Sequence, residues 1–391
     1  KGRTFFDDTF FAASGVPTNA VANGDFDMAA EDIGIDIDFS AFDDAAAFAL
    51  DLLGADSFDL PLPGFASGYQ DAFTGGQLLS FAWGTPDYET LFGRLLRAVD
   101  DHLASRGWLD RAYVYWYDEP VETRYEDLID GMRLLNEADP RLQRFLTEQA
   151  EAELLGSVDI WDSRLDFYSP GWAWPRQAVG EQVWWYVCTG PRSPYPTNFI
   201  DYPGPGPRIL SWMAWLYGIQ GSSYWDTVYW TNDAVQALLD PENTLPQDPW
   251  TDPQSYTLLP GNVVHKWGNG DGRLLYPPRT WQDGVERIEG PTPSIRFELI
   301  REGIEDFEYF WLLKSLAAEL DALGTAPDLV EEAQIRLQIP ASIVGSTREF
   351  TDDPSVLADY RERVGELLEQ IESALLAPDK GKSGSGSPGR N

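Results

Sequence analysis

The sequence predicts an α/β fold and, within that class, a (β/α)8 TIM-like barrel with additional C-terminal helices. Two patterns support this prediction. Apolar runs rich in β-branched and aromatic residues alternate with segments whose apolar residues recur at helical spacing. Strands that alternate with helices pair in parallel, and the number of such units favours a closed barrel over an open sheet. A chain of 391 residues is long enough for one large domain of this kind.

The clearest elements lie in the first third of the chain. Residues 41–54 have the Ala-rich and Leu-rich pattern of a short helix closed by glycine, and residues 58–62 are predicted to form a strand. Residues 87–106 are predicted to form a longer helix that Gly107 stops. Residues 112–117 are almost all aromatic or β-branched, which is typical of a strand buried on both faces.

The alternation continues along the rest of the chain. The later elements are predicted in this order: a helix over 125–138, strands at 158–161 and 182–188, a helix over 208–220, strands at 222–225 and 273–276, a helix over 293–323 capped by Thr292, and helical structure over 326–376. We therefore expect a barrel domain over residues 1–325, a helical extension over 326–378 and a disordered Gly/Ser tail over 379–391.

The composition points to a carbohydrate ligand and excludes others. Aromatic residues make up 14% of the chain, with 16 Trp and 17 Tyr, and flat amphipathic rings commonly hold sugar faces. The net charge of −36 disfavours nucleic acid and anionic membrane as partners. This acid excess serves solubility or, in the interpretation we favour, adaptation to high salt. The Asp residues between Asp25 and Asp38 are predicted to form a solvated loop, because the pattern of a calcium loop is missing.

Few side chains are available for nucleophilic or metal chemistry. Cys188 is the only cysteine, so the chain has no intrachain disulfide, and its apolar surroundings predict a small buried side chain. His102 and His265 are the only histidines, and neither lies in a nucleophile-elbow pattern. We therefore expect neither a metal nor another cofactor.

The N-terminal residues and the hydropathy of the chain indicate where the protein is located. No apolar run approaches the length that spans a membrane. The chain begins without Met, so we expect a piece of a longer or processed protein. We expect a secreted, periplasmic or cell-surface location, with any export signal upstream.

The adjacent carboxylates Asp118 and Glu119 are the candidate catalytic residues. They follow the buried aromatic strand at 112–117 and precede Pro120, and active sites of such barrels lie at the carboxyl ends of strands. Two close carboxylates in a dry pocket do not both ionise easily, which suits acid catalysis of glycoside cleavage. Neighbouring residues are poorly placed to flank a glycosidic bond as acid and nucleophile. They suit a substrate-assisted route, in which the 2-acetamido oxygen of the substrate attacks the anomeric carbon.

Several further motifs occur in one order from about Tyr113 to Leu313. They are Tyr117-Asp118-Glu119-Pro120, Asn198-Phe199-Ile200-Asp201, Arg208-Ile209-Leu210-Ser211-Trp212, Gly221-Ser222-Ser223-Tyr224-Trp225, the run from Gly270 to Pro277, Ser294-Ile295-Arg296-Phe297-Glu298 and the run from Arg301 to Tyr309. With these motifs the chain resembles glycoside hydrolase family 123, whose known activity is β-N-acetylgalactosaminidase. The resemblance implies that Asp118 orients and stabilises the acetamido group and that Glu119 is the general acid and base. It implies a retaining, exo-acting β-N-acetylhexosaminidase for terminal β-linked N-acetylgalactosamine.

Five other residues are candidates for substrate binding. Trp225 and Asp226 end the strand at 222–225, where they can stack on and hydrogen-bond a sugar, although barrel packing and a loop cap are equally compatible. Trp185 and Tyr186 lie on a strand that must bury one face, and Tyr276 follows a glycine-rich turn. Arg296, Glu298 and Arg301 are better explained as ordinary charges on a helix.

Three alternatives remain open. The chain can be a glycosidase for another sugar, a catalytically silent barrel that binds glycans, or a structural domain of a surface assembly. A silent barrel predicts sugar affinity that survives loss of Glu119, whereas a structural domain predicts no glycan binding.

Overall fold

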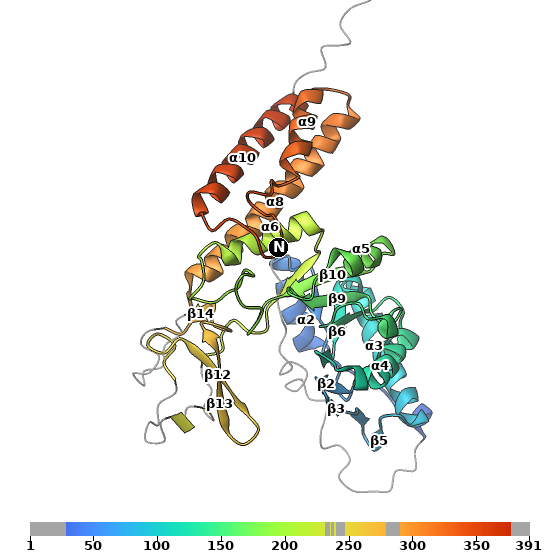
Figure 1. Cartoon of the computed structure of the whole chain (residues 1–391). Helices are drawn as coiled ribbons and strands as arrows, with labels where there is room; N and C mark the ends of the chain where they lie inside the picture. The colour runs from blue at the N-terminus through green and yellow to red at the C-terminus, as the bar shows by residue number, and fades with distance from the viewer. Residues whose placement is uncertain (1–28, 231–234, 236–237, 240–246, 279–289, 377–391) are drawn as a thin grey trace, which may run out of the picture. The chain divides into compact units, whose positions relative to one another are not determined.

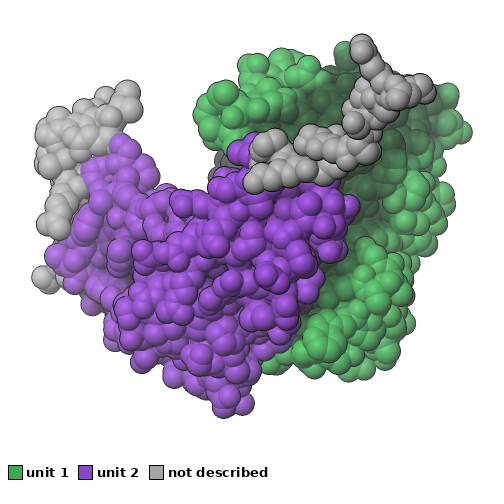
Figure 2. All heavy atoms as spheres, turned by 90° about the horizontal axis from the view of Figure 1, so that it is seen from above, with its two compact units in different colours: residues 1–187, 219–223 green, residues 188–218, 224–391 purple. Residues whose placement is uncertain are grey.

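The computed structural model describes residues 29–230, 235, 238–239, 247–278 and 290–376. The chain divides into two compact units, which Figure 2 colours separately. Unit 1 comprises residues 1–187 and 219–223, and unit 2 comprises residues 188–218 and 224–391. The predicted domain boundary at residue 325 stays a prediction, and the predicted tail over 379–391 lies outside the described residues.

A six-stranded parallel sheet forms the centre of unit 1 (Figure 1). Its strands, in spatial order, are β1 (Phe58–Asp59), β6 (Ala112–Tyr115), β8 (Gln143–Leu146), β9 (Ile160–Arg164), β10 (Gln182–Tyr186) and β11 (Gly221–Ser223). The sheet curls into a half-barrel whose edge strands are β1 and β11. The α/β class is therefore confirmed, whereas closure into eight strands is not confirmed among the described residues.

Helices connect the strands of unit 1. They are α2 (Ser40–Ala46) with the π-helical turn Ala47–Leu52, α3 (Pro86–Arg106), α4 (Tyr125–Ala138), α5 (Pro170–Ala178) and the 3-10 turns Ala30–Asp32, Leu109–Arg111, Glu122–Arg124 and Ala152–Leu154. The helix α3 begins after Thr85, whose hydroxyl accepts a hydrogen bond from the Tyr88 N–H, and it ends at Gly107, whose φ of 73° is left-handed. The predicted helices over 87–106 and 125–138 are confirmed.

The main core of unit 1 lies on one face of the sheet. Val114, Leu146 and Trp161 point to this face and are almost wholly buried with apolar residues of α3 and α4. Burial of apolar surface stabilises the folded state by about 25 cal/mol per Å². The apolar strands seen in the sequence therefore contribute to stability through this core.

Short strands extend unit 1 beyond the main sheet. β2 (Ser67–Tyr69) pairs with β3 (Ala72–Thr74) and with β7 (Tyr117–Asp118), while β4 (Gln77–Leu78) pairs with β5 (Phe81–Ala82). The predicted strand at 112–117 is thus two strands, because Trp116 separates β6 from β7.

The described part of unit 2 consists of helices and antiparallel strand pairs (Figure 1). Its elements are α6 (Gly206–Tyr217), β12 (Gln254–Leu259), β13 (Val263–Asn269), β14 (Leu275–Tyr276), β15 (Thr292–Pro293), α8 (Ile295–Ala322), α9 (Pro327–Arg336) and α10 (Pro354–Leu376). Two predictions need correction here. The strand predicted at 273–276 pairs antiparallel with β15 and does not join the parallel sheet. The cap of α8 is Ser294 and not Thr292, because the Ser294 hydroxyl accepts the Phe297 N–H at 3.3 Å.

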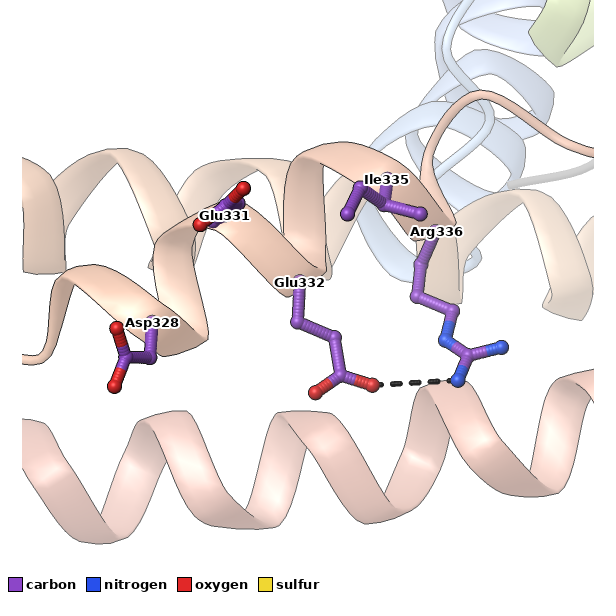
Figure 3. Close-up of a pocket in the computed structure, with 5 residues that line it drawn as sticks. All are labelled: Asp328, Glu331, Glu332, Ile335 and Arg336. Atoms are coloured by element: carbon purple, nitrogen blue, oxygen red, sulfur yellow. Dashed lines mark hydrogen bonds and ion pairs between the residues drawn. The ribbon is translucent and has the colours of Figure 1, made fainter.

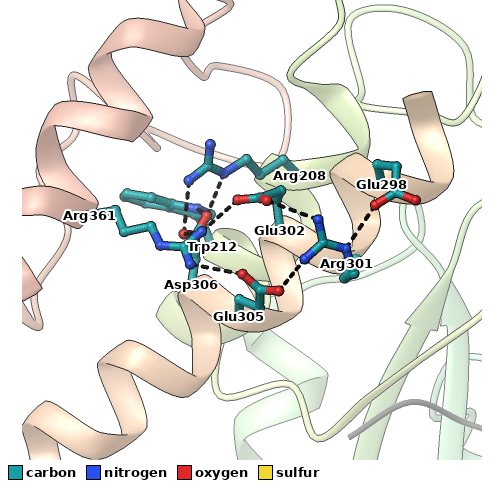
Figure 4. A network of polar contacts seen from close by, with 8 residues as sticks. All are labelled: Arg208, Trp212, Glu298, Arg301, Glu302, Glu305, Asp306 and Arg361. Carbon is teal, nitrogen blue, oxygen red and sulfur yellow. Dashed lines mark hydrogen bonds and ion pairs between the residues drawn. The ribbon is translucent and has the colours of Figure 1, made fainter.

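A buried ionic network joins α6, α8 and α10 (Figure 4). Asp306 is 1% exposed and accepts hydrogen bonds from Arg208 at 2.6 and 2.9 Å and from the Trp212 indole at 2.7 Å. Arg361 of α10 lies 3.5 Å from the same carboxylate. Two motifs that lie almost a hundred positions apart in the sequence therefore meet to hold helices together.

Candidate active site

The pleat of the sheet determines which side chains meet at its carboxyl edge. Side chains two positions apart on a strand lie on the same face. One face carries a small apolar cluster of Tyr113, Phe145, Ile160 and Trp184. Each of these four residues is followed, two positions closer to the carboxyl end of its strand, by a polar side chain. These side chains are Tyr115, Thr147, Asp162 and Tyr186. The sheet thus changes from apolar to polar at the edge where α/β enzymes carry their active sites.

Asp118 and Glu119 are held at this edge by neighbouring strands. The Thr147 hydroxyl, directly after β8, donates to Asp118 Oδ1 at 2.9 Å. The Thr147 hydroxyl oxygen also accepts a hydrogen bond from the backbone N–H of Glu119 at 2.8 Å. The Tyr186 hydroxyl, at the end of β10, donates to Glu119 Oε1 at 2.5 Å. Thr147 thus contacts both candidate residues. Tyr186 orients the carboxylate of Glu119.

The backbone of Glu119 has an unusual conformation. Its φ of 46° is left-handed, which a non-glycine residue adopts at a cost of roughly 1–2 kcal/mol. Surrounding contacts must maintain this conformation, which is typical of functional sites. Gln70, with a φ of 52°, lies beside it, and its amide nitrogen is 3.5 Å from Glu119 Oε2.

Burial is the largest influence on the ionisation of Asp118. It raises the pKa of the Asp118 carboxyl, and the charge of Glu119 raises it further. Hydrogen bonds from Tyr115 and Thr147 act in the opposite direction and favour the carboxylate. Burial and the nearby Asp118 charge also raise the pKa of Tyr115, so this phenol remains a donor.

Glu148 adds a carboxyl group that the sequence analysis did not single out. Burial raises its pKa to about 7, and the charges of Glu151 and Glu119 add to this effect. On the next strand, Asp162 is wholly buried and accepts a short hydrogen bond from the Ser223 hydroxyl. The edge of the sheet therefore concentrates acidic groups beyond the predicted pair.

The two candidates on β10 lie on opposite faces of the sheet. Tyr186 contacts Glu119, which supports a place in the site. Trp185 is wholly buried and packs edge-on against Tyr168, with 5.3 Å between ring centroids. The pleat separates neighbours on a strand, so Trp185 lies in the core on the face opposite Tyr186.

The remaining candidates belong to unit 2. Trp225 is 41% exposed and packs against Tyr229 and Trp267 at centroid distances of 5.0 and 5.1 Å. Its indole donates to Asp271 at 3.3 Å. This ring retains the exposed surface that stacking on a sugar requires.

Asp226 and Tyr276 have local partners in the same unit. Asp226 accepts the Val228 N–H at 2.7 Å, which closes a turn, and burial raises its pKa. Tyr276 is 8% exposed, packs against Trp250 and receives a hydrogen bond from Arg296. Arg296 is itself buried and donates to three backbone carbonyls. These contacts stabilise loops of unit 2.

The helices of unit 2 also carry hollows. One of about 450 Å³ is lined by Asp328, Glu331, Glu332, Ile335 and Arg336 (Figure 3). All five side chains belong to α9, and Glu332 and Arg336 form a surface ion pair at 3.2 Å. No polar groups converge there as they do around Asp118, so this hollow is a feature of a solvated helix face.

The described residues offer neither a cluster of metal ligands nor a membrane-spanning helix. Among the described residues, no three His, Cys, Asp or Glu side chains are grouped so that they can hold a metal ion. In the same part of the chain, no helix has the length and hydropathy needed to cross a membrane. Asp25 and Asp27 of the Asp-rich segment lie outside the described residues.

The fold and the site together define a class of protein. Paired acidic residues, held by hydrogen bonds at the carboxyl edge of a parallel sheet, are typical of α/β enzymes that cleave glycosidic bonds. Comparison with known families agrees. The model of the glycoside hydrolase 123 catalytic domain matches residues 66–313, which is more than half of the chain. The chain therefore belongs to glycoside hydrolase family 123.

Other comparisons are more distant. One similar solved structure is a family 123 glycoside hydrolase from Clostridium perfringens, described for glycolipid glycan hydrolysis. It is 16% identical with a TM-score of 0.49, and the match covers 86% of this chain and 55% of that chain. The chain thus spans about half the length of this relative. No curated protein matches the sequence.

Proposed function

We propose that the protein is a retaining, exo-acting β-N-acetylhexosaminidase that removes terminal β-linked N-acetylgalactosamine with help from the substrate's acetamido group. The observation that carries this proposal is the shared anchor of the two acidic residues. Asp118 Oδ1 and the Glu119 N–H both bind the Thr147 hydroxyl, at 2.9 and 2.8 Å. Residues tethered to one atom are poorly placed to flank a sugar as separate acid and nucleophile. A nucleophile supplied by the substrate removes that requirement.

In the first step, Glu119 donates a proton to the glycosidic oxygen. The acetamido oxygen attacks the anomeric carbon, and the bond from that carbon to the leaving oxygen breaks. Asp118 accepts a hydrogen bond from the acetamido N–H and stabilises the positive charge that develops on this group. The product of this step is a bicyclic oxazolinium intermediate and a free alcohol.

In the second step, the Glu119 carboxylate takes a proton from water, whose oxygen attacks the anomeric carbon. The bond between this carbon and the acetamido oxygen breaks, and the sugar leaves with its original configuration. The 2.5 Å hydrogen bond from the Tyr186 hydroxyl holds the Glu119 carboxyl group in place for this step. Two inversions at one carbon give net retention.

The contacts of the other candidates support narrower roles. Tyr186 is proposed to orient Glu119, and the exposed Trp225 is proposed to stack on a sugar ring. Asp226 and Tyr276 are proposed to shape the loops that carry Trp225. A location outside the cytoplasm remains part of the proposal.

A panel of nitrophenyl glycosides tests the proposal. We expect cleavage of the β-N-acetylgalactosaminide, slower cleavage of the β-N-acetylglucosaminide, and no turnover of the β-galactoside, which lacks the acetamido group. Proton NMR of early product should show the β-anomer first. Comparable turnover of the β-galactoside would favour a glycosidase for another sugar.

A matched pair of variants completes this test. Glu119→Gln should lose turnover of alkyl β-N-acetylgalactosaminides, whose leaving group needs protonation, and keep affinity for N-acetylgalactosamine. Glu298→Gln, on the exposed surface of α8, should behave as the wild type. Sugar binding without turnover in the wild-type protein would support a silent glycan-binding barrel.

A further inference from the structure

The hydroxyl of Thr147 occupies a position that no motif in the sequence marked. Thr147 is 8% exposed and follows β8, whose last residue is Leu146. Its hydroxyl donates a hydrogen bond to Asp118 Oδ1 and accepts one from the Glu119 N–H. A hydroxyl can donate one hydrogen bond and accept others, so this geometry satisfies the capacity of the group in both directions.

The bond to the Glu119 N–H acts on the backbone. Glu119 has a left-handed φ of 46°, and Pro120 follows it. An N–H that loses its partner in a half-buried site destabilises the conformation that buries it. The Thr147 oxygen therefore stabilises the turn that points the Glu119 carboxylate toward Tyr186.

The bond to Asp118 acts on charge. Burial disfavours the Asp118 carboxylate, whereas the hydrogen bonds from Tyr115 and Thr147 favour it. Hydrogen bonds to a charged group are stronger than those between neutral groups, so the loss of the Thr147 donor should raise the pKa of Asp118.

We propose that Thr147 is a positioning residue that keeps Asp118 ionised and Glu119 correctly turned through one shared hydroxyl. This proposal rests on the function proposed above, because it assigns the two carboxyl groups their separate tasks. Valine has the shape of threonine without the hydroxyl, and serine retains the hydroxyl. The pair Thr147→Val and Thr147→Ser therefore isolates the hydrogen bonds from packing.

Other ionisable groups face this position, and the test has to take them into account. Tyr115 comes from β6, Asp162 from β9 and Tyr186 from β10, while Glu119 and Glu148 lie beside Asp118 and Thr147 in the sequence. Arg164 acts on Glu148 with the opposite sign. None of these groups is altered in either variant, so a difference between valine and serine reports the hydroxyl.

The first measurement is the pH dependence of kcat and kcat/KM on the aryl β-N-acetylgalactosaminide. Thr147→Val should lower kcat about ten- to a hundredfold with a smaller change in KM. Its acidic limb, below which Asp118 is protonated, should move up by on the order of one pH unit. Thr147→Ser should restore most of both. An unchanged limb with valine, or a serine variant as impaired as the valine variant, would overturn the proposal.

A second measurement needs no substrate. Carbon-13 NMR of the carboxyl groups in the free protein, with Asp118→Asn used for assignment, should show a higher Asp118 pKa in Thr147→Val than in the wild type. If no glycoside is cleaved but this shift occurs, the proposed function fails and the positioning role stands. If glycosides are cleaved but the shift is absent, the positioning role fails alone.

Matched controls separate these effects from loss of stability. Thr197→Val removes another buried hydroxyl, which accepts the Phe199 N–H at 3.2 Å in unit 2, and it should leave the pH limb unchanged. Thr147→Ala serves if the valine variant does not fold. It also lacks the hydroxyl, so it should show the same displaced limb.

Discussion

Glu119 and Asp118 are proposed to act at different moments of the reaction, which variants of each can distinguish. Glu119→Gln should abolish most turnover of alkyl glycosides and spare nitrophenyl glycosides, because a good leaving group needs little protonation. Asp118→Asn should slow both classes, because charge on the acetamido group must be stabilised whatever group departs. Steady-state kinetics on the two classes measure this. Equal losses in Glu119→Gln would exclude the acid role, and full activity in Asp118→Asn would remove that residue from the mechanism.

Glu148 should make the folded state sensitive to pH. Burial raises its folded pKa to about 7 from an ordinary value of 4.5. A carboxyl with a raised pKa imposes no ionisation cost at low pH, and the cost grows as pH rises from its unfolded pKa through the folded one. Glu148→Gln should therefore stabilise the protein above pH 7 by about 1–2 kcal/mol and have little effect near pH 4.

Thermal melts at both pH values measure this effect. Glu153→Gln, in the exposed turn after Glu151, is the control and should change neither melt. A Glu148→Gln variant that melts no higher than the control at pH 8 would show that Glu148 is solvated.

The sequence identified the acidic pair but not the residues that hold it. Asp118 and Glu119 are recognisable because they end an aromatic strand. Thr147 is not, because it follows a strand of four residues that includes Gln143 and Arg144 and so lacks a continuous apolar run. The contact between Tyr186 and Glu119 spans 67 positions, and no local pattern reveals such a separation.

Strong periodicity explains which elements were predictable. The helices α3 and α4 were found because their apolar faces and end signals agree. The strand β14 was assigned to the wrong sheet, because its partner β15 is distant in the sequence and local residues do not encode pairing. Ser294 and Thr292 are both good caps, and only the hydrogen bond to Phe297 distinguishes them.

The contact between α6 and α8 should depend on Asp306. Removing one partner of a buried ion pair leaves an uncompensated charge, so Asp306→Asn should cost about 3–5 kcal/mol of unfolding free energy. Glu305→Gln is the control, because its side chain is 38% exposed and surface pairs contribute little. Urea unfolding followed by circular dichroism measures both. Equal effects of the two substitutions would show that the network contributes no more than surface charge.

The charge of the whole chain predicts a dependence on salt. With 64 acidic and 28 basic residues, carboxylate repulsion opposes the compact state in dilute buffer. Salt at molar concentration screens charges over about 3 Å, so the melting temperature should rise by several degrees between dilute and molar potassium chloride. A flat or falling midpoint would contradict adaptation to high salt and would leave the catalytic proposal unaffected.

The most direct test of the account asks which atom attacks the anomeric carbon. Substrates whose acetamido methyl carries one, two or three fluorines present a progressively weaker oxygen nucleophile in the same sugar. We expect kcat to fall steeply with each fluorine, and a thiazoline mimic of the bicyclic intermediate to bind far more tightly than free N-acetylgalactosamine. Turnover that is independent of fluorination, together with rapid cleavage of the 2-hydroxyl sugar, would contradict it.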